Sequence, residues 1–190
     1  MTIDIHAVIG WTWAALALVW AAGFPLTRKT VRSQPSGARV FHIALVLLGF
    51  SLLMGSWFRA GWLGERFMTG SRDIALAGAA LTLIGCGFAI WARITLGANW
   101  SGRATVKAGH ELITRGPYAV ARHPIYTGLL TACGGSVIAY GEWRCLLGLA
   151  MVTLAFAVKI GQEERLMLET FPQAYAAYRQ RVKALIPGVL

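Results

Sequence analysis

The sequence predicts an all-α integral membrane protein with five transmembrane helices, the last two forming a helical hairpin. Hydrophobic residues make up 56% of the 190 residues and charged residues only 14%, and the mean hydropathy is +0.57. Five apolar runs recur, at 5–26, 40–58, 73–97, 125–141 and 143–161. Their lengths approach the ~20 residues with which an α-helix crosses a bilayer core of about 30 Å. This pattern excludes an ordinary soluble domain.

The residues between and within these runs support the helical assignment. Residues 33–37 read Ser-Gln-Pro-Ser-Gly, which predicts a turn between the first two helices. Only Gly141 and Glu142 separate the fourth run from the fifth, so these two helices are expected to form a tight hairpin. Small residues that allow close approach of helices lie in the third and fourth runs: Gly78, Gly85, Gly87, Gly134 and Gly135.

Two segments are too polar to cross a membrane. The connector 98–124 contains turn-forming residues and is expected to lie over the cytoplasmic ends of the helices. In segment 162–185, successive apolar residues are mostly three or four positions apart. This spacing predicts an amphipathic helix that bends or restarts near Pro172. Its apolar residues are Leu166, Phe171, Tyr175, Tyr178, Val182 and Leu185.

The net charge of +10 could suggest a nucleic-acid partner, but the basic residues follow the membrane topology instead. Most of the 18 Lys and Arg residues lie in 27–39, 98–124 and 159–183, which five spans place on one side. The positive-inside rule makes that side cytoplasmic. We therefore expect an outside N-terminus, a cytoplasmic C-terminus, and no nucleic-acid partner.

The chain is expected to form one domain at this length, with two spans in 1–72 and the other three spans and the functional core in 73–190. Cys86, Cys133 and Cys145 lie in or beside apolar runs, without the spacing of a zinc site or a disulfide framework. They are interpreted as small packing residues, and no metal is expected.

The most informative motif is Arg122-His123-Pro124-Ile125-Tyr126-Thr127-Gly128. Pro124 suits the first turn of a helix, so the fourth span is expected to begin there. Free N–H groups at such an end favour an anionic group. His123 and Tyr126 could then contact a ligand, and Gly128 would leave room for it. The alternative is an interfacial helix cap without a ligand.

The second motif is the pair Glu163 and Glu164 near the end of the fifth run. Acidic side chains are unfavourable beside an anionic leaflet and at a helix C-terminus, so this pair needs a partner. That partner is either a cationic ligand or a neighbouring Arg in a structural ion pair.

Together with further residues, these motifs resemble the isoprenylcysteine carboxyl methyltransferase family, in particular its short prokaryotic members. The resemblance covers about residues 93–187 and begins with Leu96-Gly97-Ala98-Asn99-Trp100-Ser101 and Gly116-Pro117-Tyr118. It continues through the two motifs above to Phe171, Tyr175-x-x-Tyr178-x-x-Arg181-Val182 and Ile186-Pro187. The first two spans carry no motif of the family.

The resemblance implies S-adenosyl-L-methionine as the methyl donor, in a pocket closed by the connector and the C-terminal helix. The cofactor-binding residues that it implies are Tyr118, His123, Pro124, Tyr126, Gly128, Glu163 and Glu164. It implies catalytic roles for Arg181 and Glu164, with Arg181 orienting the carboxylate of the acceptor. Asn99 and Trp100 are further candidates for acceptor binding. The alternative for Arg181 is a contact with a lipid phosphate.

The resemblance therefore implies carboxyl O-methylation, with methyl transfer to the carboxylate of a lipophilic acceptor that enters from the bilayer. Alternatives are a phospholipid N-methyltransferase, a small-thiol methyltransferase, an NADPH-dependent enzyme like the sterol reductases, and a non-enzymatic membrane protein. Phe171-Pro172 stands where the family commonly has Phe-Gly, and Lys183 where eukaryotic members often have Pro. The brevity of the chain suggests a prokaryotic cytoplasmic membrane, where the acceptor could be a lipid-linked molecule other than a prenylated protein.

Overall fold

The computed structural model describes residues 4–23, 25, 30–33, 37–100, 105–107 and 111–186. For 30–33, 37–39 and 105–107 it describes the backbone alone. The α-helices are α1 (Ile5–Gly23), α2 (Gly37–Met54), α3 (Arg72–Leu96), α4 (Pro124–Tyr140), α5 (Trp143–Thr170) and α6 (Pro172–Arg181). Short 3₁₀ turns are η1 (Ser56–Phe58), η2 (Gly61–Gly64), η3 (Gly97–Asn99) and η4 (Gly116–Ala119), and the strands are β1 (Thr30–Ser33) and β2 (Thr105–Lys107).

Each of the five apolar runs forms a helix. Three helices are long and apolar enough to cross a membrane: Ile5–Gly23, Arg72–Asn99 and Trp143–Thr170. The second predicted span corresponds to a shorter apolar helix, Val40–Met54, and α4 has 17 residues. An apolar helical bundle is thus confirmed, whereas the count of five spans stays a prediction.

The structure differs from the expected fold in two places. β1 and β2 pair in a small antiparallel sheet, which joins the segment after α1 to the connector after α3. The fifth helix does not end at 161 but continues to Thr170. Glu163 and Glu164 therefore lie inside a helix rather than at its C-terminus. Residues 162–170 are mostly strong helix formers, and the first residue that opposes helix continuation is Pro172.

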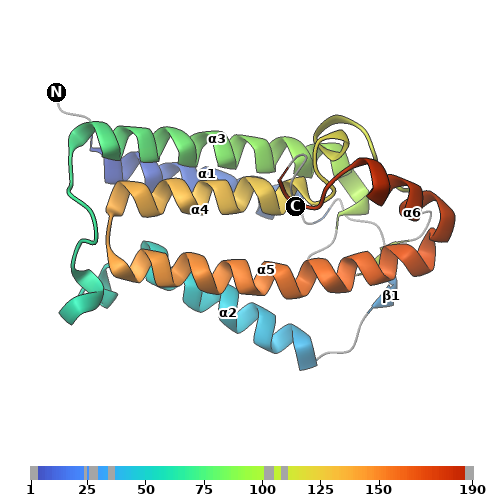
Figure 1. The fold of residues 1–190 in the computed structure, drawn as a ribbon, viewed down its shortest axis with the longest axis horizontal. Coiled ribbons are helices and arrows are strands. Elements are labelled where there is room, and N and C mark those ends of the chain that lie inside the picture. The colour runs from blue at the N-terminus through green and yellow to red at the C-terminus, as the bar shows by residue number, and fades with distance from the viewer. Residues whose placement is uncertain are drawn as a thin grey trace.

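The helices form an elongated bundle whose two ends differ (Figure 1). α1, α3 and α4 lie on one side, and α2 and α5 lie along the other. α1 begins at one end, and α6 and the described part of the connector lie at the other, here called the pocket end (Figure 1). The predicted hairpin is confirmed: α4 ends at Gly141, whose φ of 63° is left-handed, and α5 begins at Trp143. Its two arms have different main partners, because α4 packs mainly on α3 and α5 mainly on α2.

Four glycines make the contact between α3 and α4 close enough to exclude any side chain. A Cβ at Gly85 would lie 2.4 Å from the backbone nitrogen of Ala132, and one at Gly128 would lie 2.6 Å from that of Ala89. Gly78 and Gly135 continue the same contact toward the far end. Gly87 and Gly134, by contrast, have nothing within 4 Å of a Cβ. Sequence alone could not separate these two kinds of glycine.

The two kinds of glycine provide a matched pair for mutagenesis. We expect Gly85→Ala to lower stability by about 1–3 kcal/mol, because its methyl group would overlap the backbone of α4. Gly87→Ala, two residues away on the same helix, is expected to be neutral or slightly stabilising, since a helical Ala is favoured over Gly. Thermal unfolding of both variants in detergent micelles measures the difference. Equal midpoints for the two variants would contradict the close α3–α4 contact.

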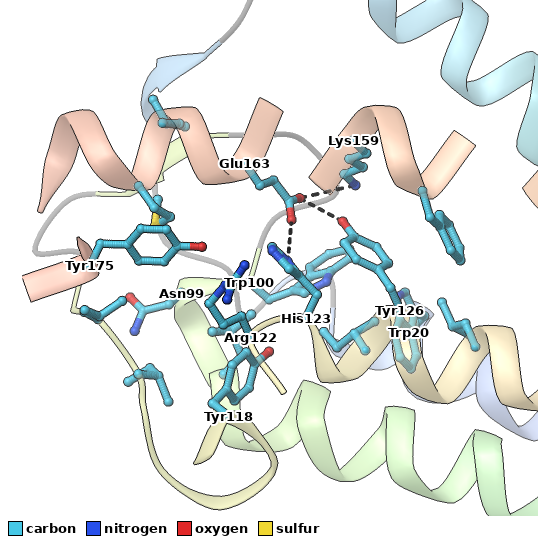
Figure 2. Close-up of a pocket in the computed structure, with 18 of the residues that line it drawn as sticks. Trp20, Asn99, Trp100, Tyr118, Arg122, His123, Tyr126, Lys159, Glu163 and Tyr175 are labelled. Carbon is cyan, nitrogen blue, oxygen red and sulfur yellow. Dashed lines mark hydrogen bonds and ion pairs between the residues drawn. The ribbon is translucent and has the colours of Figure 1, made fainter. Parts of the chain in front are cut away.

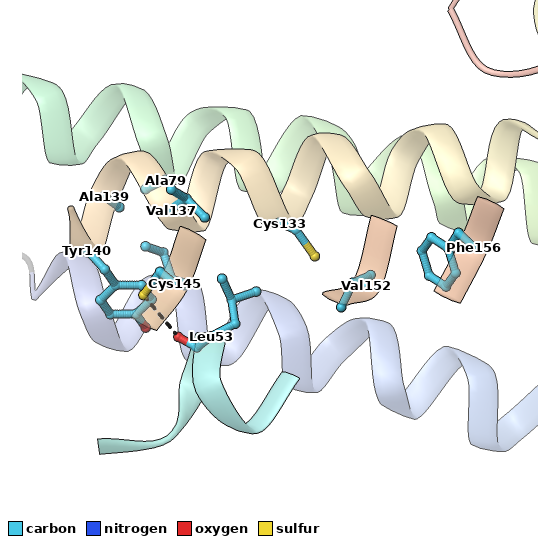
Figure 3. Close-up of a cluster of buried hydrophobic side chains, with 10 residues drawn as sticks. Leu53, Ala79, Cys133, Val137, Ala139, Tyr140, Cys145, Val152 and Phe156 are labelled. Atoms are coloured by element: carbon cyan, nitrogen blue, oxygen red, sulfur yellow. Dashed lines mark hydrogen bonds between the residues drawn. The ribbon is translucent and has the colours of Figure 1, made fainter. Parts of the chain in front are cut away.

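The three cysteines are buried packing residues, as interpreted from the sequence. Cys133 and Cys145 lie in the main hydrophobic cluster, with Leu53 of α2 and Val152 and Phe156 of α5 (Figure 3). Cys145 is close enough for its thiol to contact the carbonyl of Leu53, at 3.6 Å. The cluster thereby joins the two sides of the bundle.

At the end opposite the pocket, a buried arginine closes the C-terminus of α2. The Arg144 side chain is only 1% exposed, and its guanidinium donates to the carbonyls of Leu52, Leu53 and Gly55 at 2.6–3.1 Å. It also pairs with Glu142, which in turn pairs with Arg59 at 3.1 Å. A helix C-terminus leaves carbonyls without partners, and Arg144 supplies the donors.

Candidate functional site

At the pocket end, the helices and the connector enclose a cavity of about 410 Å³. All five long helices, the connector and α6 contribute to its lining. In Figure 2 the side chains of α5 face those of the connector and the start of α4 across this space. Such a volume lies within the range of about 300–1,000 Å³ that is typical of small-molecule sites.

Glu163 is the central carboxylate of the lining. It accepts a hydrogen bond from the Tyr126 hydroxyl at 2.8 Å, lies 3.6 Å from the Nδ1 of His123, and pairs with the Lys159 ammonium at 3.8 Å. These three groups converge on it from α4, from the residue before α4 and from α5 (Figure 2). Its side chain is 21% exposed, so a ligand in the cavity can reach it.

Glu164 has a different role, because it lies outside the cavity lining. The Arg122 guanidinium donates to one oxygen of Glu164 through Nε at 2.8 Å and through Nη2 at 2.6 Å. Arg179 of α6 pairs with the other oxygen at 3.4 Å. For Glu164, the geometry is that of the structural ion pair that the sequence left open, and it ties α5 to α6 and the connector.

His123 links the two glutamates. It is 8% exposed, with Nδ1 directed at Glu163 and Nε2 at Glu164, 3.3 Å away. Burial by itself would lower the pKa of His123, but hydrogen bonds to both glutamates and their negative charges outweigh burial, so the pKa is raised. The protonated imidazole can donate to both carboxylates at once.

This raised pKa makes the stability of the fold depend on pH. The stabilisation from protonated His123 is fully present below the unfolded pKa of about 6.5 and is lost as pH rises through the folded pKa. We expect the wild-type protein to exceed His123→Gln in thermal midpoint at about pH 6 and to lose a few degrees of that advantage by about pH 9. Unfolding scans of both proteins across this range measure it. A difference independent of pH would contradict a titrating His123.

Aromatic side chains form much of the remaining wall. The Tyr178 hydroxyl of α6 donates to the carbonyl of Tyr118 in η4, and burial raises the pKa of Tyr178 to about 12. Burial also raises the pKa of Tyr118, so both phenols stay neutral near pH 7. Tyr175 lies beside Tyr178, with ring centroids 5.9 Å apart.

Arg93 positions another part of this wall. Its guanidinium lies 4.4 Å from the ring centroid of Trp100 and donates to the carbonyls of Gly23 and Gly97 at 2.8 and 3.0 Å. It thereby joins the ends of α1 and α3 beneath the indole. The neighbouring Asn99 also lines the cavity, and its buried Oδ1 has no hydrogen-bond partner among the described residues. This oxygen is an acceptor that a ligand could satisfy.

The C-terminal segment is attached to the Arg122–Gly128 motif by backbone contacts. The amides of Arg122 and His123 donate to the carbonyls of Lys183 and Ala184 at 2.8 and 2.9 Å, and the Thr127 hydroxyl donates to Leu185 at 2.9 Å. α6 contributes Tyr175 and Tyr178 to the lining. That this helix closes a cofactor pocket stays a prediction.

The structure brings most of the predicted site residues together. Those that line the cavity are Asn99, Trp100, Tyr118, His123, Tyr126 and Glu163. Pro124 is fully buried at the first position of α4, as expected for the helix start, but is not in the lining. Gly128 does not leave space for a ligand as expected, because it faces α3 and the backbone of Ala89 occupies that space. Arg181 lies at the end of α6, exposed, and is not among the described lining residues.

Sequence reasoning did not assign Arg122, Lys159 or His42, all of which line the cavity. For two of these residues, the sequence contains a signal that could have identified them. Arg122 stands inside the recognised motif, and Lys159 precedes Glu163 by four residues, which places both on one helix face. His42 had none, because only the tertiary fold brings α2 to this cavity.

Comparisons with known proteins show similarity to membrane methyltransferases. Residues 78–169 match the model of the isoprenylcysteine carboxyl methyltransferase (ICMT) family. Protein-S-isoprenylcysteine O-methyltransferase B of Arabidopsis thaliana is 33% identical over 81 residues, which are 42% of this chain and 41% of that protein. Methanethiol S-methyltransferase 1 of Bradyrhizobium diazoefficiens is 39% identical over 71 residues, 37% of this chain and 24% of that protein.

A solved structure shows the same fold. The eukaryotic intramembrane Ras methyltransferase ICMT matches 84% of this chain and 55% of its own, with a TM-score of 0.56 and 21% identity. The matches to the two curated relatives span only about a quarter to two fifths of the length of those proteins. The resemblance drawn from the motifs is confirmed: residues 78–169 carry the sequence pattern of the isoprenylcysteine carboxyl methyltransferase family.

Proposed function

We propose that this chain, whose residues 78–169 match the model of the isoprenylcysteine carboxyl methyltransferase family, transfers a methyl group from S-adenosyl-L-methionine to the carboxylate of a lipophilic acceptor. One observation carries the proposal: the family motif around His123 and the carboxylate of Glu163 meet in a single cavity that extends into the apolar bundle. The family match at 78–169 includes both His123 and Glu163.

The residues present fit such a cofactor. Glu163 offers a partly exposed carboxylate to an ammonium group, and Arg122 and protonated His123, though paired with the glutamates, place positive charge beside the cavity for a carboxylate. Tyr118, Trp100 and the α6 tyrosines present aromatic faces for a purine, and the unpartnered Oδ1 of Asn99 can accept from an amine or a hydroxyl. When bound, S-adenosylmethionine supplies a methyl group on a cationic sulfur, which an anionic oxygen can take directly while the electron pair of the broken bond returns to sulfur.

The protein's part in this reaction is positioning rather than proton transfer. A carboxyl group with a pKa of about 3.5 is already ionised at neutral pH, so the acceptor needs no general base. Glu163 places a negative charge where a cationic donor is to be held, and Tyr126 and His123 keep that carboxylate in place. The apolar lining from Leu129 and Phe156 excludes water from the reacting groups.

The proposed setting is a prokaryotic cytoplasmic membrane, with the pocket end in the cytoplasm. Exposed cations cluster at that end, among them Arg115, Arg165, Arg179 and Lys183, as the positive-inside rule expects. Arg181 at the end of α6 then faces the headgroup region, where a lipid-phosphate contact suits it better than the orienting role implied by the family. A C-terminal reporter that is active only in the cytoplasm tests this orientation, and activity of a periplasmic reporter there contradicts it.

Transfer of radiolabelled methyl groups tests the function. Purified protein in lipid nanodiscs is incubated with labelled S-adenosylmethionine and an S-prenylated cysteine, phosphatidylethanolamine or a small thiol. We expect a product of the first that releases methanol in base, as a carboxyl ester does. Base-stable label on the amine or the thiol would instead establish one of the alternative acceptors. Protection from thermal unfolding by NADPH, but not by S-adenosylhomocysteine, would favour the reductase alternative.

A further inference from the structure

Along the helices, the polar side chains of the cavity lining end at one level, and Lys159 lies at that level. Along α5, successive turns of the lining contribute Phe156, Lys159 and Glu163. Along α4, Tyr126 is followed one turn deeper by Leu129. In Figure 2 Lys159 lies close to both Glu163 and Tyr126.

The lining residues of α2 also change from polar to apolar with depth in the bundle. His42 is the first lining residue of α2 at the pocket end, and the next two, Val46 and Phe50, are apolar and lie deeper in the bundle. The Nδ1 of His42 donates to the carbonyl of Ala155, at 3.1 Å, one turn before Lys159 on α5. The last polar lining residues of α2, α4 and α5 are thus His42, Tyr126 and Lys159, which lie near one another. Deeper in the bundle, the lining residues of these helices are apolar.

The Lys159 ammonium is held within the cavity wall rather than in solvent. Its side chain is 12% exposed, its nitrogen lies 3.8 Å from Glu163, and it lies 5.7 Å from the centroid of the Tyr126 ring. A charge at such a depth needs compensation from the protein or from a ligand.

The local charges favour an anionic ligand group at this level. The ion pairs beside the cavity contain Arg122, Lys159 and protonated His123 against Glu163 and Glu164, whereas Arg179 is exposed on α6 and screened by solvent. Glu111 also lines the cavity, but it is exposed on the connector, where solvent screens it. A bound cationic methyl donor would increase the positive excess, and an amine acceptor would increase it further. A carboxylate would offset it.

We infer that Lys159 determines acceptor specificity: its ammonium holds the carboxylate headgroup of a lipophilic acceptor whose chain lies in the apolar part of the cavity. The chain would contact residues of four helices: Leu16, Val46, Phe50, Leu129 and Phe156. This inference rests on the proposed function and assigns to Lys159 the acceptor contact that the family resemblance implied for Arg181.

Direct binding tests the inference without requiring turnover. The probes are S-farnesyl mercaptoacetate and its primary amide, which differ in charge and scarcely in shape, with wild-type protein in nanodiscs. We expect the acid to bind at least about tenfold more tightly than the amide, the scale of one charge-assisted hydrogen bond. Lys159→Met should remove this preference by weakening the acid alone, and Lys159→Arg should retain most of it. Arg165→Met, an exposed cation on the same helix, serves as the control.

Three results would overturn the inference: equal affinity of wild type for acid and amide, binding of neither, or an unchanged preference in Lys159→Met. If Lys159 serves only to neutralise Glu163, the variant will change affinity for S-adenosylhomocysteine and leave the acid-to-amide ratio as it was. The methyl-transfer assay separates this result from failure of the proposed function. If wild type forms the labelled ester and Lys159→Met has an unaltered KM for the acceptor, the role of Lys159 is refuted and the proposed function stands.

Discussion

Glu163→Gln is expected to weaken binding of S-adenosylhomocysteine by about one to two orders of magnitude. A hydrogen bond to a charged group contributes about 1.5–3 kcal/mol, and Glu163 is the carboxylate that the cavity presents to an ammonium group. Glutamine keeps the shape and the hydrogen bond with Tyr126 but removes the charge. Isothermal titration calorimetry of the detergent-solubilised protein measures the loss.

Two controls separate binding from folding. Glu65→Gln changes an exposed carboxylate in the segment that joins η2 to α3, at the far end of the bundle, and should leave the affinity unchanged. Glu164→Gln should act mainly on stability, because Glu164 pairs with Arg122 and Arg179 outside the cavity lining. If Glu163→Gln binds as tightly as wild type while keeping its thermal midpoint, Glu163 is an internal counterion for Lys159 and His123 rather than a cofactor contact.

The largest effect on stability is expected from Arg144→Met, at about 3–5 kcal/mol. The substitution leaves Glu142 without one of its two cationic partners and removes the donors to the last carbonyls of α2. Methionine fills a similar volume, so the cost arises from unpaired polar groups and not from a cavity. The midpoint of thermal unfolding in micelles should fall by about 10 °C or more.

Arg72→Met provides the matched control, since Arg72 is exposed in the first turn of α3 at the same end of the bundle. Adding Glu142→Gln to Arg144→Met should restore part of the loss, because the double variant no longer contains an incompletely paired buried carboxylate. A fall of less than about 1 kcal/mol in Arg144→Met would show that water satisfies the α2 carbonyls without it. Because Arg144 lies far from the pocket end, the ligand affinity of whatever protein remains folded should be unchanged.

Much of the fold followed from hydropathy and a few turn residues. The five apolar runs each form a helix. A helix pairs its backbone N–H and C=O groups within one segment and keeps apolar side chains away from water, as a bilayer requires. Pro124 marked the start of α4, and Gly141 with Glu142 marked the hairpin turn, since each residue type restricts the backbone locally. The β1–β2 pairing had no such local signal, because it depends on two loops meeting at one end of the bundle.

The candidate site was partly predictable for the same reason. His123, Tyr126 and Glu163 were found because their residue types and spacing stand out in an apolar sequence, and the cavity brings them together. Adjacent glutamates point in different directions on a helix, about 100° apart, so sequence could not say which of Glu163 and Glu164 faces the cavity. Gly128 was misjudged because a small residue leaves space for a ligand or for a neighbouring helix, and here α3 occupies that space.

By itself, the sequence determined the membrane-type helical bundle, the start of α4 and the family pattern within 78–169, because each rests on local chemistry or residue order. Only the tertiary structure decided that Glu163 faces the cavity, that Glu164 joins α5 to α6, and that Lys159 and His42 meet where the lining turns apolar. These relations depend on the rotation of each helix about its axis. That rotation is set by packing against the other helices, as at the glycine contact between α3 and α4.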